Sequence, residues 1–372
     1  MAATQEALYR DLDLELSWSE RELPQHERTR HVHGLHPYLG KFVPQLVQIL
    51  LQRHFRAGQR VLDPFAGSGT TLVQALESGL DAAGADVAAF NCLLMDVKTR
   101  RYDVFQLESE LRAVAARIDQ LEPDVAPSAS AYVREWYAPS SAAELLAFRD
   151  LVGDYEHADV LRVVLSRAAR SARLAAHFDL DFPRASQRAP YWCHKHRRTC
   201  RPVETARPFL RRYALDTLAR LKAFGRVRAQ RREAVVLHGD SRQLDLPEAD
   251  GIVTSPPYPG LIDYHEQHRY AYELLDLAHQ GDAELGRPAS GAGRDAIARY
   301  CDDVVAVLEN AVARLPRRAP VIVVVNDRRG FYPGILERAG LRLERRLRRH
   351  VNRRTGRRSG EFFEDVLVAR AG

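Results

Sequence analysis

Short apolar runs alternate with longer amphipathic segments in two separated parts of the chain. The apolar runs lie at 60–63, 81–87, 234–238, 251–254, 319–325, 341–351 and 362–369. Their length and composition are those of buried strands. Segments with apolar residues at helical spacing lie at 44–55, 70–78, 262–278, 294–315 and 332–339. This alternation predicts a doubly wound α/β domain with helices on both faces of a sheet.

The stretch between these two parts does not follow the alternation. Four of its segments carry apolar residues at helical spacing: 105–121, 142–151, 158–178 and 209–224. We therefore divide the chain into an N-terminal arm over 1–30, an α/β domain formed by 31–94 and 233–372, and a mostly helical insertion over 95–232.

The composition indicates a folded chain without membrane segments. With 372 residues and 45% hydrophobic content, the chain can bury a sizeable core in one large domain or two ordinary ones. There is no apolar run of about 18 residues, and the first residues lack a basic start followed by an apolar segment, so we expect no membrane span and no signal peptide. Four cysteines do not make a disulfide framework, which favours a reduced, cytoplasmic setting.

Positive charge is concentrated in two places. The net charge is +6, but residues 184–232 hold fifteen Arg or Lys and two acidic residues, and residues 337–358 hold ten Arg and two Glu. Such clusters are typical of proteins that bind a polyanion such as nucleic acid. The alternative is a solvated, arginine-rich surface encoded by a GC-rich genome.

Aromatic and basic residues are interleaved within 188–202, inside the basic insertion. This mixture suits phosphate contact and base stacking. We expect five residues to contact nucleic acid: Tyr191, Lys195, Arg197, Arg198 and Arg201. The same segment holds four potential zinc ligands: Cys193, His194, His196 and Cys200. Their spacing fits no common structural zinc site, so we favour structural cysteines in a loop that faces DNA, and metal binding there stays open.

An irregular segment rich in His, Gly and Pro precedes the first predicted helix, over 31–43. Its histidines, His31, His33 and His36, have no cysteine or carboxylate beside them, which is weak support for a metal site. We expect this segment to cover a ligand, and we expect no metal in the catalytic site.

Two consecutive prolines follow the predicted strand at 251–254, in Thr254-Ser255-Pro256-Pro257-Tyr258. Neither proline can continue a sheet, so the chain leaves the strand in a rigid, extended turn. The turn places a hydroxyl, a carbonyl and an aromatic ring together at the carboxyl end of a strand. In open α/β sheets this is the edge where ligands bind.

A second turn, Asp63-Pro64-Phe65-Ala66-Gly67-Ser68-Gly69-Thr70, follows the first predicted strand. Its glycines allow close approach of a ligand to the backbone, and the next helix begins there. The turn is not a P-loop, because no lysine follows the second glycine, and it lacks the third glycine of the dinucleotide fingerprint. Asp86 ends the second strand, where a carboxylate can hold ribose hydroxyls or cap the next helix.

Together, Asp63–Thr70 and Thr254–Tyr258 resemble the paired motifs of the S-adenosylmethionine-dependent amino-methyltransferases of DNA. Residues 36–44 (HPYLGKFVP) resemble the segment that precedes the first strand in these enzymes, and the likeness covers roughly 31–91 and 234–370. It implies a Rossmann-like, seven-stranded class I methyltransferase sheet whose last strand is antiparallel. Serine at the first position of the Ser-Pro-Pro-Tyr motif is typical of the cytosine-N4 branch, whereas the adenine-N6 branch usually carries Asp or Asn there.

The resemblance also implies roles for single residues. The residues expected to bind S-adenosylmethionine are Lys41, Phe42, Asp63, Phe65, Gly67, Gly69, Thr70, Asp86 and Asp240. The expected catalytic residues are Ser255, Pro256, Pro257 and Tyr258. The hydroxyl of Ser255 and the carbonyl of Pro256 would accept hydrogen bonds from the target amino group, in a turn that the prolines hold rigid. Tyr258 would stack on a base flipped out of the duplex.

We therefore expect a site-specific methyltransferase for the N4 amino group of cytosine in double-stranded DNA. A cognate restriction endonuclease is a further candidate partner. One alternative is adenine-N6 methylation of DNA or RNA on the same scaffold. Another is a catalytically idle DNA-binding subunit, which the intact turn at Gly67-Ser68-Gly69 argues against. The insertion departs from the family pattern, since it falls between the second and third strand units, and its role in target recognition is inferred from charge and position.

Overall fold

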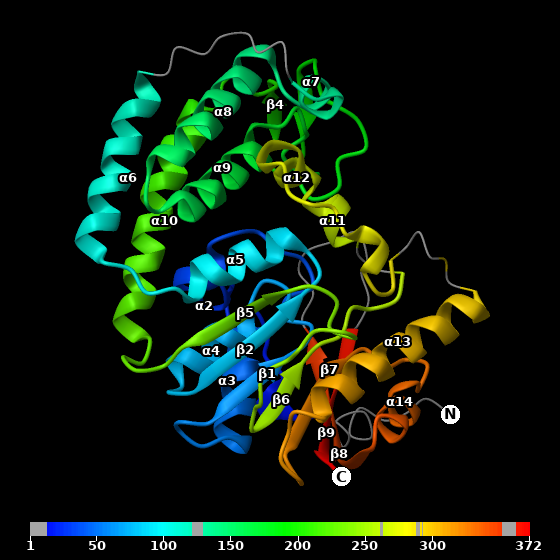
Figure 1. The fold of residues 1–372 in the computed structure, drawn as a ribbon. Coiled ribbons are helices and arrows are strands. Elements are labelled where there is room, and N and C mark those ends of the chain that lie inside the picture. Colours follow the sequence, from blue (N-terminus) through cyan, green and yellow to red (C-terminus); the bar gives the residue numbers. More distant parts are fainter. Residues whose placement is uncertain (1–12, 121–128, 261–262, 288–290, 292, 352–361) are drawn as a thin grey trace. The chain divides into compact units, whose positions relative to one another are not determined.

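The structure, a computed structural model, describes residues 13–120, 129–260, 263–287, 291, 293–351 and 362–372 (Figure 1). The chain forms two compact units. We call Met1–Thr99, Val227–Ile262 and Gln280–Gly372 the sheet unit, and Arg100–Arg226 with Asp263–His279 the helical unit. The helical unit thus takes in a second, short segment beyond the predicted insertion.

A seven-stranded sheet forms the centre of the sheet unit. Its strands are β1 (Arg60–Asp63), β2 (Asp81–Asp86), β5 (Ala234–His238), β6 (Gly251–Thr254), β7 (Pro320–Val325), β8 (Leu341–Val351) and β9 (Phe362–Ala371). Their order in the sheet is β5-β2-β1-β6-β7-β9-β8, and every pair is parallel except those made by β9. The prediction of a class I methyltransferase sheet with an antiparallel last strand is confirmed.

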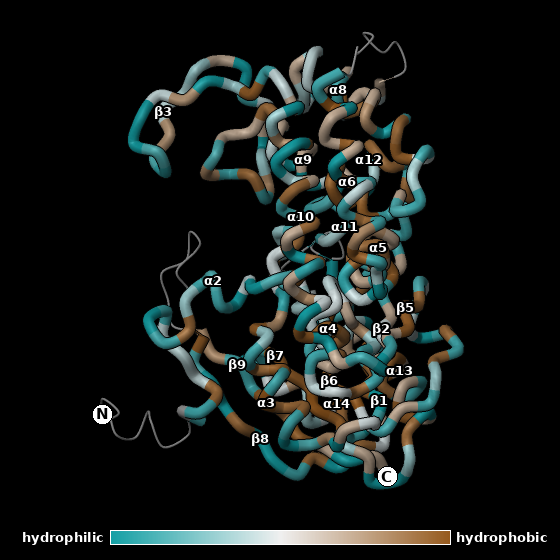
Figure 2. The backbone as a smooth tube through the Cα atoms, turned by 90° about the vertical axis from the view of Figure 1, so that its left-hand side faces the viewer, coloured by the Kyte–Doolittle hydropathy of each residue, from teal (hydrophilic) through white to brown (hydrophobic). Residues whose placement is uncertain are grey.

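The side chains of alternate strand residues pack into two hydrophobic cores, one on each face of the sheet. On β1, Val61 belongs to the first core and Leu62 to the second. Helices α3 (Pro44–His54), α4 (Thr70–Glu77) and α5 (Ala89–Thr99) supply the first core. Helices α13 (Arg294–Val312) and α14 (Tyr332–Arg338) supply the second. β7 is buried along its whole length, and its tube is correspondingly hydrophobic in Figure 2, as expected for a strand covered on both faces.

The N-terminal part that the structure describes packs on the sheet unit through η1 (Leu14–Leu16), followed by α2 (Gln25–Arg28) and η2 (His31–Gly34). Leu16 lies in the first core, and its carbonyl accepts a hydrogen bond of 3.1 Å from Arg349 of β8. Residues 1–12 of the predicted arm lie outside the described residues.

The arginine-rich run at 337–358 is in part internal to the sheet. Arg346 of β8 pairs with Asp365 of β9 at 2.9 Å, and Arg349 pairs with Glu364 at 2.9 Å. Opposite charges on neighbouring antiparallel strands stabilise the pairing of those strands. Four of the ten arginines, Arg353, Arg354, Arg357 and Arg358, lie outside the described residues.

The helical unit contains α6 (Val104–Asp119), α7 (Ala131–Trp136), α8 (Pro139–Leu151), η3 (Val152–Asp154), α9 (Ala158–Ala172), α10 (Arg207–Val227), α11 (Tyr264–Gln267) and α12 (Arg269–Leu275). α12 packs against α7, α8 and α9, which ties the second segment to this unit. The single helix predicted over 262–278 is two short ones, since the backbone at His268 leaves the helical region; residue 262 itself lies outside the described residues. None of the described helices is both long and apolar enough to cross a membrane.

Helix α9 ends six residues earlier than the periodicity over 158–178 predicts. Arg173 adopts an extended backbone conformation, with ψ 146°, and ends the helix. Its buried guanidinium donates to the carbonyl of Leu180 and lies 4.6 Å from the ring centre of Tyr270. A short hairpin that the sequence did not predict follows, made by β3 (Tyr191–Cys193) and β4 (Arg198–Cys200).

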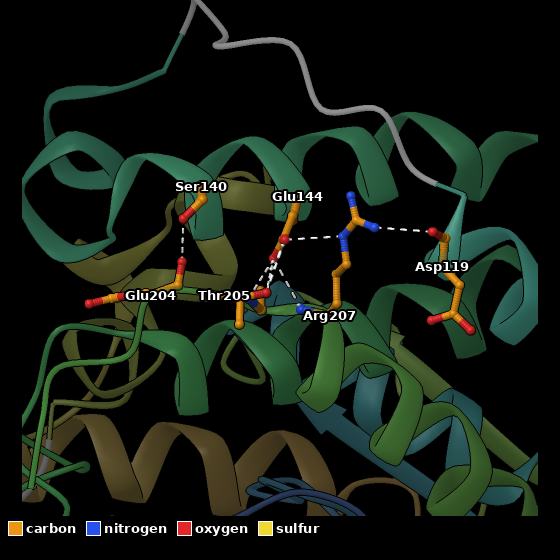
Figure 3. Close-up of polar contacts among 7 residues, drawn as sticks. Asp119, Ser140, Glu144, Glu204, Thr205 and Arg207 are labelled. Carbon is orange, nitrogen blue, oxygen red and sulfur yellow. Dashed lines mark hydrogen bonds and ion pairs between the residues drawn. The ribbon is translucent and has the colours of Figure 1, made fainter.

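A buried carboxylate organises the start of α10. Glu144 of α8 accepts hydrogen bonds from the hydroxyl of Thr205 at 2.9 Å and from the backbone N–H groups of Ala206 at 2.6 Å and Arg207 at 3.1 Å (Figure 3). It also receives Nε of Arg207 at 3.1 Å. The first N–H groups of a helix have no partner within the helix, so Glu144 caps α10 from a different helix.

We expect Glu144→Ala to destabilise the helical unit by roughly 2–4 kcal/mol, because it leaves several buried donors without an acceptor. Thermal unfolding followed by circular dichroism measures the loss. Glu204→Ala is the matched control, since that exposed residue uses only its backbone carbonyl, which accepts from Ser140. An equal loss in the two variants would contradict the capping role.

Candidate active site

The carboxyl ends of β2, β1 and β6 are neighbours in the sheet and bring the predicted residues together. Asp86 ends β2, Asp63 ends β1, and Ser255 follows β6 directly. Both neighbouring pairs, β2 with β1 and β1 with β6, run parallel, so these ends lie at one edge. We call this edge the catalytic edge.

Asp63 connects the two turns of the catalytic edge. Its Oδ1 accepts the hydroxyl of Thr254 at 2.6 Å and the backbone N–H of Phe65 at 3.1 Å, and its Oδ2 accepts the hydroxyl of Thr71 at 2.6 Å. Burial raises the pKa of Asp63 to about 6, although the three hydrogen bonds act in the opposite direction. Both oxygens are therefore used within the protein, so the contact that the resemblance implies with the methionine part stays a prediction.

The glycine turn has a backbone that only glycine adopts easily. Gly67 and Gly69 have φ values of 51° and 79°. A Cβ on Gly67 would lie 3.0 Å from the hydroxyl of Tyr38, and one on Gly69 would lie 2.8 Å from Cγ of Met95. The backbone N–H of Gly67 donates to Oδ2 of Asp86 at 2.9 Å. The turn is thus fixed from the loop before α3 and from α5.

One face of α5 supports the turn with residues that the sequence did not single out. Asn91, Met95 and Lys98 share this face because they are spaced by four and three residues. Nδ2 of Asn91 donates to Asp86 at 3.0 Å and to the hydroxyl of Tyr38 at 3.1 Å, while Nζ of Lys98 donates to the carbonyl of Ser68. Burial, with the charge of Lys41, lowers the pKa of Lys98 well below its ordinary value. Asn91 and Lys98 could have been found in the sequence, because they are polar residues on the otherwise apolar, buried face of a helix.

Asp86 performs a capping role and also faces the glycine turn. Its Oδ1 accepts the backbone N–H of Ala88 at 2.8 Å, just before α5 begins. Burial raises its pKa, and the carboxylate of Glu284 adds to that effect, against the hydrogen bonds from Ala88, Asn91 and Gly67. Asp86 stays partly exposed at the end of β2, as a ribose ligand requires.

The segment before α3 is held by a hydrogen bond between two of its own residues. Nζ of Lys41 donates to the carbonyl of His33 at 2.7 Å, and Phe42 packs at the edge of the first core. His31, His33 and Glu77 hold potential ligand atoms close together. Burial, with the nearby cationic groups, lowers the pKa of His33 well below its ordinary value. Glu77, however, already pairs with Arg30 at 2.6 Å, so a metal ion here would compete with that ion pair.

Asp240 follows β5, but its carboxylate is held by Arg242. Nε and Nη2 of Arg242 lie 3.0 Å and 2.7 Å from Oδ2 of Asp240. Burial alone would raise the pKa of Asp240, but the hydrogen bonds and charge of Arg242 outweigh it. The net result is a pKa below the ordinary value for aspartate. The predicted contact of Asp240 with the adenine amino group would compete with this ion pair.

The Ser-Pro-Pro-Tyr turn is fixed by its neighbours in the sheet. The hydroxyl of Ser255 donates to the carbonyl of Val324 on β7 at 2.9 Å. The carbonyl of Pro257 accepts the hydroxyl of Tyr300 at 2.9 Å, whereas no donor among the described residues reaches the carbonyl of Pro256. The carbonyl of Pro256 is thus open to a ligand, and so are the lone pairs of the Ser255 hydroxyl that its contact with Tyr258 does not use.

Tyr258 lies partly exposed beside the last strand. Its hydroxyl donates to Oε1 of Glu364 at 3.2 Å, and its ring centre is 6.5 Å from that of Phe362. Burial and the charge of Glu364 raise the pKa of Tyr258 well above its ordinary value. The ring is therefore held by one edge, and its hydroxyl stays protonated.

The residues predicted to contact DNA all lie in or beside the β3–β4 hairpin of the helical unit. Four exposed cations pair with no acidic residue among those that the structure describes: Lys195, Arg197, Arg198 and Arg201. Other members of the basic run are paired, such as Arg207 with Glu144 and Lys222 with Glu108. The hydroxyl of Tyr191 accepts the backbone N–H of His177 at 3.0 Å. The hairpin and the residue after it thus hold four of the unpaired cations of the run, and further exposed ones without an acidic partner among the described residues include Arg184, Arg212, Arg226 and Arg231.

The chain is similar in sequence to known DNA methyltransferases. The family model for N6/N4-type "DNA methylase" matches residues 5–95. The chain is 33% identical over 430 aligned positions to the "Type II methyltransferase M.MjaII" of Methanocaldococcus jannaschii, which covers 92% of this chain and 81% of that protein.

Two solved structures are similar at much lower identity. TrmN from Thermus thermophilus is 16% identical over 90% of this chain and 50% of its own, with a TM-score of 0.32. The rRNA methyltransferase aviRa from Streptomyces viridochromogenes is 14% identical over 90% of this chain and 88% of its own, with a TM-score of 0.34. The fold assignment rests on the strand order of this chain. The identity to the archaeal enzyme extends over most of both sequences, and the chain therefore belongs to the N4/N6 family of S-adenosylmethionine-dependent DNA methyltransferases.

Proposed function

We propose that the chain methylates the exocyclic N4 amino group of cytosine in double-stranded DNA, at a specific site and after base flipping. The hydroxyl of Ser255 is the observation that carries this proposal. Its hydrogen is donated to Val324, so its lone pairs point elsewhere and can accept. An amino group is a donor, and Ser255 with the carbonyl of Pro256 offers it two neighbouring acceptors.

These acceptors address the chemical difficulty of the reaction. The lone pair of an exocyclic amino nitrogen is conjugated with the ring, which makes the nitrogen a poor nucleophile. Hydrogen bonds from both amino hydrogens favour a tetrahedral nitrogen whose lone pair is directed at the methyl group. Serine is a weaker acceptor than a carboxylate, so the chain acts chiefly by positioning the nitrogen, and the proton is released to solvent after transfer.

The described residues fit S-adenosylmethionine, which supplies the methyl group when bound. Gly67 and Gly69 put no side chain between the backbone of the turn and a ligand, while Tyr38 and Met95 fill the space that a Cβ would take and hold the turn in place. Asp86 would hold the ribose hydroxyls, and Phe65 would cover the cofactor. Lys41 and Phe42 would close the site from the loop before α3.

Target recognition is assigned to the helical unit as part of the same proposal. The hairpin region carries four closely spaced unpaired cations, and Trp192 on it is 56% exposed, a large apolar surface beside positive charge. Such a surface suits phosphate contact with some base stacking. The relative named a type II methyltransferase is in keeping with a site-specific enzyme. A cognate restriction endonuclease and a cytoplasmic setting complete the proposal.

Identification of the methylated nucleoside in the product tests the proposal that cytosine is the target base. The chain should convert unmethylated DNA to a product that yields N4-methylcytosine when digested to nucleosides and analysed by mass spectrometry. Ser255→Ala, purified in parallel, should lower the yield by about tenfold or more through loss of an acceptor in the transition state. N6-methyladenine as the sole product, in DNA or in RNA, would overturn the choice of cytosine. Failure of the wild-type chain to bind S-adenosylmethionine would point to an idle subunit.

We expect Tyr258→Ala to lower the transfer rate by roughly 5- to 100-fold, the range for one stacked base. Its affinity for S-adenosylmethionine, measured by calorimetry, should change by less than about threefold, since the ring serves the base. Tyr258→Phe is the control, because it keeps the ring and removes only the hydrogen bond to Glu364. A loss confined to cofactor affinity would refute stacking.

The hairpin cations should set part of the salt dependence of DNA binding. Replacing Arg197 and Arg198 together by Gln should reduce the slope of log K against log salt by roughly two, because each phosphate contact contributes about 0.9. Arg112 and Arg117 on α6, both paired with acids, replaced together by Gln give the same change in charge as a control. An unchanged slope in the hairpin variant would remove the hairpin from the DNA interface.

A further inference from the structure

Four potential metal ligands converge in the helical unit, outside the catalytic edge. They are His177, Cys193, His196 and Cys200, and one ligand atom from each lies within 4.8 Å of the others. We propose that these four residues bind a structural zinc ion, which fixes the β3–β4 hairpin to the segment that follows α9.

The hairpin supplies three of the ligands. Cys193 is the last residue of β3 and Cys200 the last of β4, with His196 in the turn between the strands. Nδ1 of His196 lies 3.4 Å from Sγ of Cys200. Zinc bonds of about 2.3 Å to sulfur and 2.0–2.1 Å to nitrogen, at tetrahedral angles, place these two atoms roughly 3.6 Å apart. The observed separation is therefore close to that of a coordinated pair.

His177 supplies the fourth ligand from the irregular segment after α9. Its ring centre lies 4.7 Å from that of His196, and its backbone N–H donates to the hydroxyl of Tyr191 on β3. Nδ1 of His177 is buried and has no hydrogen-bond partner among the described residues. A buried nitrogen without a partner is costly, and coordination of a cation satisfies it.

The ligand set identifies the metal. Cys193 is 0% exposed and Cys200 7%, and both thiols are free of disulfides. Two thiolates with two imidazoles make a closed tetrahedral set, which is the structural zinc type and leaves no position for substrate. The two thiolate charges would balance the ion, so the exposed cations of the hairpin keep their net charge for an external anion.

The local structure also requires a cross-link. Each strand of the hairpin has three residues, and residues 173–190 before it contain no helix or strand. An isolated two-stranded hairpin of this length is not stable in water. Small units without an adequate core commonly rely on a metal. A zinc ion at this point would hold both segments in one conformation.

The sequence alone pointed to a different set of ligands. It suggested His194 with Cys193, His196 and Cys200, whereas the ring of His194 instead lies 5.9 Å from that of Phe178. The fourth ligand, His177, is sixteen residues before Cys193 and outside the segment that was considered. The spacing His-x15-Cys-x2-His-x3-Cys matches no common motif, which is why spacing gave little support. This inference does not depend on the proposed base specificity or on DNA binding.

The metal content of the purified full-length chain tests the proposal. Expression with zinc in the medium, purification without chelator and mass spectrometric metal analysis should give about one zinc per chain. Cys193→Ser and His177→Ala should lower this to roughly one-tenth or less. Cys301→Ser and His194→Ala, a cysteine and a histidine outside the set, are the matched controls and should retain the full content.

A second measurement uses only the wild-type chain, so that a misfolded variant cannot decide the outcome. Exchange of the ion for Co²⁺ should give thiolate-to-cobalt charge transfer and the intense visible bands of a tetrahedral site. Zinc absent from the wild-type chain after incubation with the metal would overturn the proposal. So would a Cys193–Cys200 disulfide found by intact mass under non-reducing conditions, or equal zinc content in the cluster variants and their controls.

Discussion

The buried carboxylate of Asp63 holds the catalytic edge together. It bonds Thr254 at the end of β6 and Thr71 in the first turn of α4, so the Ser-Pro-Pro-Tyr turn and the glycine turn share one side chain. A buried charge is tolerated only when its oxygens are hydrogen-bonded, and three donors provide this. The placement of the two turns relative to each other thus depends on this one side chain and on the pairing of β1 with β6.

Polar groups that support this edge occupy positions where apolar residues would pack better. Lys98 is a buried lysine whose amino group donates to the carbonyl of Ser68, and Asn91 joins Asp86 to Tyr38. Each of these contacts costs desolvation in a helix that otherwise packs on the first core. The glycine turn needs such support, because its backbone has no side chains of its own to hold it.

The sequence predicted the sheet well because its central strands are unbroken apolar runs, such as β7, and helices separate them. Contacts between distant segments were not predictable from spacing. The bond from Ser255 to Val324 exists because β6 and β7 are neighbours, and the approach of His177 to Cys193 depends on an irregular segment without periodicity. Strands of three residues, as in the hairpin, are too short for alternation to show. Arg349 was counted as surface charge, since cross-strand register cannot be read from composition.

The helical unit is built from two separate stretches of chain, and this limits how the unit could be exchanged with that of a relative. A chimera that replaced only Arg100–Arg226 would bring in new versions of α7, α8 and α9 but keep the old α12, which packs on all three. The mismatch would fall in the interior of the transplanted part. A workable exchange therefore carries Asp263–His279 as well, so its second junction comes within five residues of Tyr258. Any such exchange would accordingly alter residues that lie close in sequence to the Ser-Pro-Pro-Tyr turn.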